Sequence, residues 1–207
     1  RSIDKWVWDC WLYDDGYDFH IFFLQAPKSL GDSDKRHFNA TVGHAKSKDL
    51  KNWEFLPDAL QPSVEPAWDE IATWTGSVVR NPIDNLYYMF YTGVTLPSGG
   101  IVQQIGYATS SDLITWSKNS SNPITSADSN FYDTQSNGHK DTNWRDPWVF
   151  FDAEDSLWHM FNTADYKGGG EKTRATIAHA TSSDLKKWTV QRPLCGESGF
   201  GQLEVLQ

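Results

Sequence analysis

The phrase Ala45-Lys-Ser-Lys-Asp-Leu-Lys-Asn-Trp53 decides the fold, because the chain carries its pattern three times. The other copies are Ala108-Thr-Ser-Ser-Asp-Leu-Ile-Thr-Trp116 and Ala180-Thr-Ser-Ser-Asp-Leu-Lys-Lys-Trp188. All three fit A-x-S-x-D-L-x-x-W, and self-similarity at steps of about 60 to 70 residues is typical of a repeat architecture. The Asp of each copy recurs with the pattern, so we assign it to the scaffold. A short carboxylate can accept backbone N–H bonds at a turn.

An aromatic-rich apolar run precedes each copy of the phrase. The runs are residues 19–24, 86–91 and 157–161. They are apolar on both faces, which is typical of strands that lie between two neighbouring sheets. A turn-forming cluster and another short apolar segment come before each run, so every repeat reads as four short antiparallel strands. The sequence therefore predicts an all-β propeller in which each repeat is one blade.

The number of repeats indicates a fragment. The third repeat ends near Trp188, and residues 201–207 have the pattern of the first strand of a fourth repeat. A propeller closes on itself to bury the faces of its blades and to protect its edges. Three repeats and one strand do not close such a ring. We therefore expect residues 1–207 to be the N-terminal part of a single propeller domain whose remaining blades are missing.

Charge and composition narrow the class of partner. The 207 residues include 27 acidic and 18 basic side chains, a formal net charge of -9, and no run of basic residues. We therefore expect no nucleic acid and no membrane as partner, since both attract basic surfaces.

The chain begins with Arg1, so we expect that the natural N-terminus is missing. The compartment therefore stays open, with the cytoplasm favoured. The oligomeric state also stays open.

Polar residues that break the repeat are the candidates for function. The first strand of each repeat differs from its counterparts and carries Asp9, Ser77, Asp146 and, in the incomplete fourth repeat, Glu204. Asp9, Ser77 and Asp146 lie at similar distances before the Ala of their own repeats, so we interpret them as positional equivalents. The first strand of a blade lines the central channel. Asp9, Asp146 and Glu204 are therefore expected to converge on one pocket.

Three carboxylates in one pocket suit the hydrolysis of a glycosidic bond. They repel one another, so at least one pKa should be raised. One carboxyl must be protonated to donate to the leaving oxygen, and another must be ionised to attack the anomeric carbon or to activate water. Aromatic residues make up 14% of the chain, and Trp8, Trp11 and Trp74 flank the acids in the first strands. We expect these indoles to bind substrate, because aromatic faces stack on sugars.

Several phrases, in order along the whole chain, resemble glycoside hydrolase family 32 and its relatives in families 68 and 43. Arg145-Asp146-Pro147 resembles the R-D-P motif of the family, Trp74-Thr-Gly-Ser77 is similar to F-S-G-S, and Phe23-Leu-Gln-Ala-Pro27 is similar to Y-Q-Y-N-P. Trp8-Asp9-Cys10-Trp11 looks closer to the W-D-x-W phrase of family 68. The resemblance implies a five-bladed catalytic propeller that releases terminal β-fructofuranosyl units from sucrose or fructans with retention of configuration.

The same resemblance implies a role for each candidate. Asp9 takes the place of the nucleophile, Glu204 that of the general acid/base, and Asp146 that of the transition-state stabiliser. Arg145, Gln25 and Ser77 take the places of residues that hold the sugar. Glu204 is followed by Val205, where the family usually has Cys.

Three alternatives stay open. A family 43-like arabinosidase or xylosidase would invert, with carboxyls about 6.5 to 9.5 Å apart in place of the 5 to 5.5 Å of a retaining enzyme. A family 68-like fructosyltransferase would pass the sugar to another sugar. A propeller that binds carbohydrate without catalysis belongs to a different class, but such propellers repeat their binding residues, whereas these differ between blades. We expect no cofactor and no metal, since this chemistry requires none and no His/Asp/Glu cluster at ligand spacing indicates one.

Overall fold

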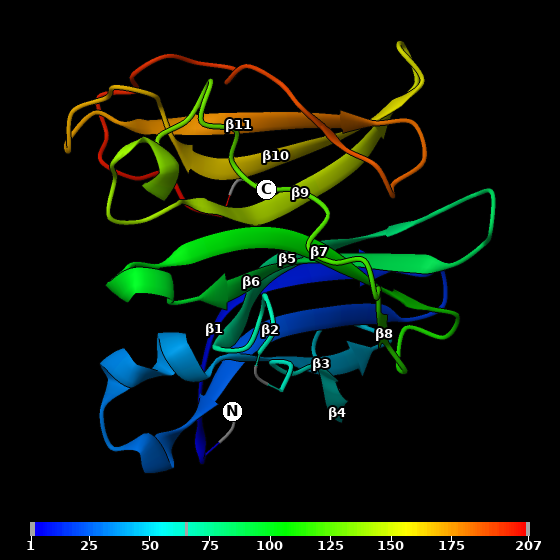
Figure 1. Ribbon diagram of the computed structural model, residues 1–207. Coiled ribbons are helices and arrows are strands. Elements are labelled where there is room, and N and C mark those ends of the chain that lie inside the picture. Colours follow the sequence, from blue (N-terminus) through cyan, green and yellow to red (C-terminus); the bar gives the residue numbers. More distant parts are fainter. Residues whose placement is uncertain (1–2, 65, 206–207) are drawn as a thin grey trace.

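The computed structural model describes residues 3–64 and 66–205, and within them the chain forms three four-stranded sheets (Figure 1). The first sheet contains β1 (Lys5–Asp14), β2 (Phe19–Pro27), β3 (Thr41–Ser47) and β4 (Glu54–Leu60). The second contains β5 (Ala72–Arg80), β6 (Tyr87–Thr95), β7 (Val102–Ser110) and β8 (Ser117–Lys118). The third contains β9 (Trp144–Asp152), β10 (Leu157–Asp165), β11 (Ala175–Ser182) and β12 (Thr189–Val190).

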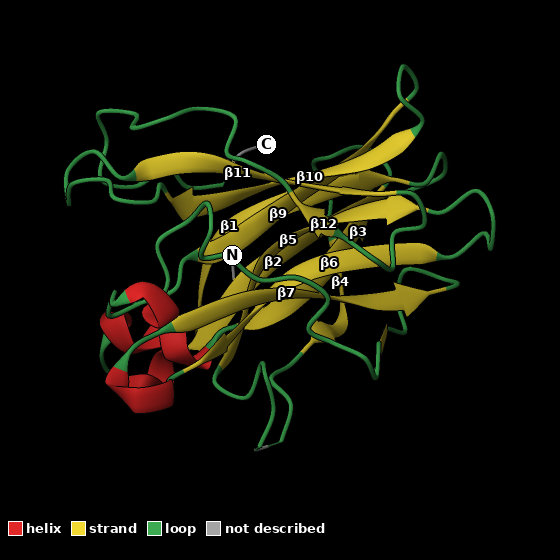
Figure 2. Ribbon diagram, turned by 45° about the horizontal axis from the view of Figure 1, so that its top comes forward, coloured by secondary structure: helices red, strands yellow, loops and turns green. Residues whose placement is uncertain are grey.

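Each sheet is an antiparallel meander whose strands follow one another in chain order. The predicted blades are therefore confirmed, with four strands to each repeat. The helical elements are short 3-10 turns: η1 (Lys28–Leu30), η2 (Ser33–Asn39), η3 (Pro97–Gly99) and η4 (Gln135–Asn137). They lie at the ends of strands, as Figure 2 shows in red. No helix in the described ranges has the length and apolarity that crossing a membrane requires.

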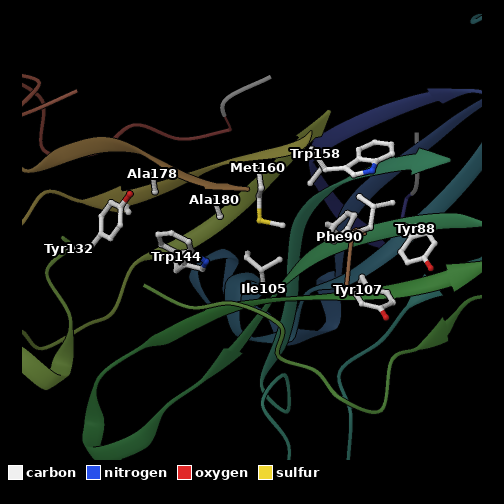
Figure 3. Close-up of a cluster of buried hydrophobic side chains, with 13 residues drawn as sticks. Tyr88, Phe90, Ile105, Tyr107, Tyr132, Trp144, Trp158, Met160, Ala178 and Ala180 are labelled. Carbon is white, nitrogen blue, oxygen red and sulfur yellow. The ribbon is translucent and has the colours of Figure 1, made fainter. Parts of the chain in front are cut away.

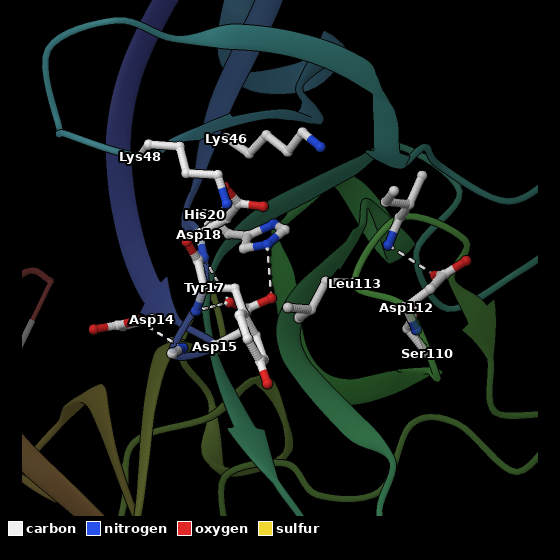
Figure 4. A network of polar contacts seen from close by, with 12 residues as sticks. Asp14, Asp15, Tyr17, Asp18, His20, Lys46, Lys48, Ser110, Asp112 and Leu113 are labelled. Carbon is white, nitrogen blue, oxygen red and sulfur yellow. Dashed lines mark hydrogen bonds and ion pairs between the residues drawn. The ribbon is translucent and has the colours of Figure 1, made fainter.

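The repeated phrase forms the turn between the third and fourth strands of each blade. In the second blade, Asp112, which is labelled in Figure 4, accepts hydrogen bonds at Oδ1 from the backbone N–H groups of Ile114 at 2.9 Å and Thr115 at 2.8 Å. Leu113 adopts a φ of +62°, and its carbonyl accepts the indole N–H of Trp116 at 2.9 Å. The same Asp contacts recur in the first and third blades. The assignment of this Asp to the scaffold is confirmed.

The core lies between neighbouring sheets. Phe90 and Ile105 of the second sheet meet Trp144 and Met160 of the third (Figure 3), and all four are fully buried. A second cluster joins the first sheet to the second and includes Trp11. The aromatic run in β6 is buried on both faces because the second sheet lies between the other two, whereas the runs in β2 and β10 also include half-buried side chains.

Residues 201–205 differ from expectation, because they form no strand. A strand needs a hydrogen-bonded neighbour, and no described segment pairs with these residues as a ladder. The predicted first strand of a fourth blade is therefore not seen here, and residues 206–207 lie outside the described part of the chain.

Candidate active site

A cavity of about 230 Å³ brings the three predicted acids together. Asp9 reaches it from β1, Asp146 from β9, and Glu204 from the segment after the third blade. Of the residues predicted to bind substrate, Trp8, Trp74 and Arg145 also line it. The first strands of three blades therefore converge as expected, since β5 lies against both β1 and β9.

A β-bulge in each first strand aims a side chain into the cavity. In β1 the register shifts between Trp8 and Cys10, so Asp9 is the extra residue. In β9 the shift leaves Asp146 and Pro147 opposite one residue of β10. Asp9 and Asp146 adopt φ angles of +36° and +58°, which are uncommon for residues with a side chain. Bulges of this kind often redirect side chains beside functional sites, and the backbone strain that they hold is offset elsewhere in the fold.

The equivalent position in the second blade is Thr75, so the assignment of Ser77 was wrong. The register of β5 shifts between Trp74 and Gly76, which makes Thr75 the bulged residue. Thr75 lines the cavity and donates a hydrogen bond from Oγ1 to Asp9 Oδ2 at 3.2 Å. Ser77 is buried, and its Oγ accepts the backbone N–H of Val149 at 3.1 Å, which joins β5 to β9. Ser77 therefore has a structural contact and does not line the cavity.

Trp11 and Gln25 are also absent from the cavity wall. The bulge at Asp9 reverses the alternation of side chains along β1, so Trp11 turns into the core and stacks on Phe22, with ring centroids 6.0 Å apart. Gln25 is buried and donates from Nε2 to Asp58 Oδ1 at 2.6 Å. Its neighbour Leu24 lines the cavity, since successive side chains of β2 point to opposite faces.

The protonation of Asp146 is strongly perturbed by its surroundings. Burial raises the pKa of Asp146 to about 6, and the positive charge of Arg145 opposes that rise. The charges of Asp9 and Glu204 also raise this pKa, but they contribute less than burial does. Asp146 Oδ2 accepts hydrogen bonds from Thr163 Oγ1 and from the backbone N–H of Val205, both at 3.3 Å. The expected raised pKa is present, and desolvation is its main cause.

Arg145 connects the buried end of the cavity to Glu204. Its Nη2 donates to Glu204 Oε1 at 2.9 Å, and its Nη1 donates to Gln103 Oε1 at 3.2 Å and Asn143 Oδ1 at 3.1 Å. The side chain of Arg145 is 7% exposed and that of Glu204 is 59% exposed. The acids thus span the cavity from its buried interior, at Asp146, to its open mouth, at Glu204.

Sequence reasoning missed His37, which lines the same cavity from η2. Trp74 donates its indole N–H to the carbonyl of His37 at 2.6 Å. The only sequence signal is that Arg36-His37 lies in a long connection between two strands of one blade, where binding residues are often found.

One group of described side chains could hold a metal ion. Ligand atoms of Asp152, Asp155 and His159 lie within 4.8 Å of one another beside the β9–β10 turn. The sequence does hold this cluster, which the expectation of none overlooked. The corresponding turn of the first blade places Asp15 near His20. That of the second blade places Asp84 where it accepts a hydrogen bond from the Tyr88 hydroxyl. This recurrence indicates a structural role, and none of the three residues lines the cavity.

Comparison with known proteins identifies the relatives of the chain. A family model described as "Glycosyl hydrolases family 32 N-terminal domain" matches residues 10–206, beginning one residue after Asp9. An insoluble-isoenzyme beta-fructofuranosidase of Arabidopsis thaliana is 31% identical over 194 residues, which cover 90% of this chain and 29% of that protein. A 6(G)-fructosyltransferase of Asparagus officinalis is 31% identical over 146 residues, which cover 69% of this chain and 22% of that protein.

Among solved structures, fructan 1-exohydrolase IIa from Cichorium intybus matches with a TM-score of 0.75 and 24% identity. The match covers 99% of this chain and 35% of that one. The chain therefore spans about a third or less of the length of these proteins.

Proposed function

The chain belongs to glycosyl hydrolase family 32, and from this membership we propose that the whole protein is a retaining glycoside hydrolase. It releases terminal β-fructofuranosyl units from sucrose or fructans. Residues 1–207 form the N-terminal part of its single catalytic propeller domain. The observation that carries the proposal is the shared cavity of Asp9, Asp146 and Glu204.

Asp9 is the nucleophile of this scheme. The bulge of β1 presents its carboxylate to the cavity, and Thr75 holds Oδ2 by a hydrogen bond. The other oxygen, Oδ1, attacks the anomeric carbon while the bond to the leaving oxygen breaks. A covalent fructosyl-enzyme ester results, and attack by water later releases fructose and restores the carboxylate.

Glu204 is the general acid and then the general base. It gives its proton to the leaving oxygen in the first step and takes a proton from the attacking water in the second. In the free site Glu204 Oε1 accepts a hydrogen bond from Arg145 Nη2 at 2.9 Å, which orients the carboxyl at the mouth of the cavity.

Asp146 does not transfer protons. Its buried carboxylate accepts hydrogen bonds from sugar hydroxyls, and these strengthen as positive charge develops on the ring. Above a pH of about 6 it is mostly ionised. Arg145, Trp8 and Trp74 complete the binding surface of the cavity.

Transfer of the fructosyl unit to another sugar is a second candidate. The similarity to a protein named 6(G)-fructosyltransferase favours it, as does the phrase Trp8-Asp9-Cys10-Trp11. It shares the first step with hydrolysis and differs only in the acceptor. The open mouth at Glu204 is compatible with either acceptor.

The experiment incubates the full-length protein with sucrose, inulin and levan, and follows products and their anomeric form by NMR. Free fructose of retained configuration supports hydrolysis, and longer fructosides support transfer. Fructose of inverted configuration contradicts the proposed chemistry. Failure to cleave any fructoside, with arabino- or xylo-oligosaccharides cleaved instead, contradicts the proposed substrate.

A further inference from the structure

Two tryptophans fasten the segment η2 at the mouth of the cavity. The indole N–H of Trp74 binds the carbonyl of His37 at 2.6 Å. The guanidinium carbon of Arg36 lies 5.4 Å from the centroid of the Trp8 ring, and Arg36 Nη1 also donates to the carbonyl of Ser33 at 3.0 Å. Both indoles belong to the first strands that carry the bulged residues. The backbone of His37 is therefore held in a fixed place relative to the acids.

The imidazole of His37 stands between these two indoles. Its ring meets Trp8 at a centroid distance of 5.8 Å and an interplanar angle of 70°, and meets Trp74 at 6.4 Å and 78°. The ring is half-buried and lines the same cavity as Asp9 and Glu204. Edge-on aromatic contacts of this kind orient a ring without using its nitrogen atoms.

Both ring nitrogens of His37 lack a hydrogen-bond partner within the described residues. Each of the other five histidines binds a carboxylate or another imidazole through at least one ring nitrogen. Those histidines have structural partners, whereas His37 presents free polar atoms to a cavity. Burial, followed by the positive charge of Arg36, lowers the pKa of His37. At neutral pH its ring is therefore neutral and offers one donor and one acceptor.

The position of His37 along the cavity indicates which part of a substrate it meets. Asp146 lies at the buried end, and the largely exposed Glu204 lies at the open end. In the proposed chemistry Glu204 protonates the leaving oxygen, so the sugar beyond that oxygen occupies the open end. His37 is half-buried on the cavity wall. The charges of Asp9 and Glu204 are among those that act on its ring, whereas that of Asp146 is not.

We propose that His37 is a specificity-determining residue that hydrogen-bonds a hydroxyl of the leaving sugar between Trp8 and Trp74. This inference rests on the proposed function. A leaving group with sugar hydroxyls gains the contact, and one without them does not.

The test compares sucrose with an aryl β-fructofuranoside, whose leaving group carries no sugar hydroxyl, in the full-length protein. The variant His37→Phe keeps an aromatic ring against the two indoles but removes both polar atoms. A lost hydrogen bond of about 0.5 to 1.5 kcal/mol corresponds to a loss of about 2- to 10-fold. We expect kcat/KM for sucrose to fall by that factor relative to kcat/KM for the aryl fructoside.

His37→Gln restores a donor and an acceptor, so it should recover most of the wild-type ratio between the two substrates. Lys35→Ala is the matched control, because it changes an exposed side chain of the same segment that does not line the cavity. It should leave the ratio unchanged. A general disturbance of the site would lower kcat/KM for both substrates by the same factor.

The outcomes separate this inference from the proposed function. In one outcome the wild-type protein is active, and His37→Phe keeps the wild-type ratio of the two kcat/KM values or lowers both values equally. In that case the inference alone is overturned. If the wild-type protein cleaves neither fructoside, the proposed function fails, and the inference fails with it because there is then no leaving sugar.

Discussion

Thr75 donates a hydrogen bond from Oγ1 to Oδ2 of Asp9 across 3.2 Å, and so joins the first strands of two neighbouring blades at the proposed nucleophile. Both residues are the extra residues of β-bulges. Thr75 is 1% exposed, so water does not replace its hydroxyl readily. The orientation of the nucleophile therefore depends on the packing of the second blade against the first.

Thr75→Val should lower kcat without unfolding the protein. Valine has nearly the same shape, but it cannot donate to Asp9. A hydrogen bond to a charged group contributes about 1.5 to 3 kcal/mol, so we expect a loss of about 10- to 100-fold. Steady-state kinetics on sucrose measure the loss. Thr75→Ser keeps the hydroxyl and should restore most of the rate, and equal rates in the valine and serine variants would contradict this role.

Asp146 should determine the acid limb of the pH–rate profile. Its proposed role requires the ionised carboxylate, and burial raises its pKa to about 6. We therefore expect kcat/KM to fall as the pH is lowered through about 6, because protonation removes the acceptor. A profile that stays level down to a pH of about 4, the ordinary range of an Asp, contradicts this assignment.

Asp146→Asn should lower kcat/KM by about 100-fold or more above a pH of about 6, since an amide carries no charge to balance that of the transition state. The loss should shrink below that pH, where the wild-type carboxyl is protonated. Asp128→Asn, at a half-buried acid that does not line the cavity, serves as the control for loss of a carboxylate elsewhere in the protein. An Asp146→Asn protein with the wild-type rate at neutral pH would exclude a catalytic role for the carboxylate. Melting temperatures would show whether both variants are folded.

Two blades carry a pair of histidines where the second blade carries two tyrosines. His20 Nδ1 and His44 Nε2 share a hydrogen bond of 2.9 Å, and His159 and His179 do the same. Burial, and then the neighbouring His20 and Lys46, lower the pKa of His44 to about 3. The folded state therefore keeps His44 neutral in a range in which the unfolded chain binds a proton.

The first of these pairs should make the stability depend on pH. An unfolded histidine binds its proton near pH 6.5, so stability is lost as the pH falls below that value. Asp15, 3.5 Å from His20, opposes the loss only in part, because burial outweighs it in lowering the pKa of His20. Replacing His20 and His44 together by tyrosine copies the second blade and should reduce the loss.

Melting temperatures at about pH 7.5 and about pH 5 measure this effect. The wild-type protein should lose more stability between the two values than the double variant. His139→Gln, which changes a half-exposed histidine, is the control. Equal losses in the wild type and the double variant would contradict the assignment to this pair.

The repeats were predictable from the sequence because each letter of the phrase has a local role. Asp112 accepts hydrogen bonds from backbone N–H groups of the turn, and Leu113 takes the left-handed conformation. Trp116 donates its indole N–H to the carbonyl of Leu113. Local contacts of this kind leave the same residues in every copy. The meeting of Asp9 with Asp146 was predictable for the same reason, since equivalent strands of a propeller face one channel.

The residues that were missed depend on register, which the repeat does not encode. A bulge moves every later side chain of its strand to the other face. Trp11 therefore entered the core, and Thr75 took the place assigned to Ser77. His37 was missed because its contact with Trp74 joins a connection of the first blade to a strand of the second, 37 residues away, and no motif spacing indicates such a contact.

The covalent intermediate on Asp9 tests the central claim most directly. In the full-length Glu204→Gln variant, an aryl β-fructofuranoside with a good leaving group can form the ester without an acid, but the ester lacks the base for its hydrolysis. Peptide mass spectrometry after rapid quenching should find one hexosyl unit on the peptide that contains Asp9. Release of the aryl group with no adduct, or with the adduct on another residue, would contradict the account.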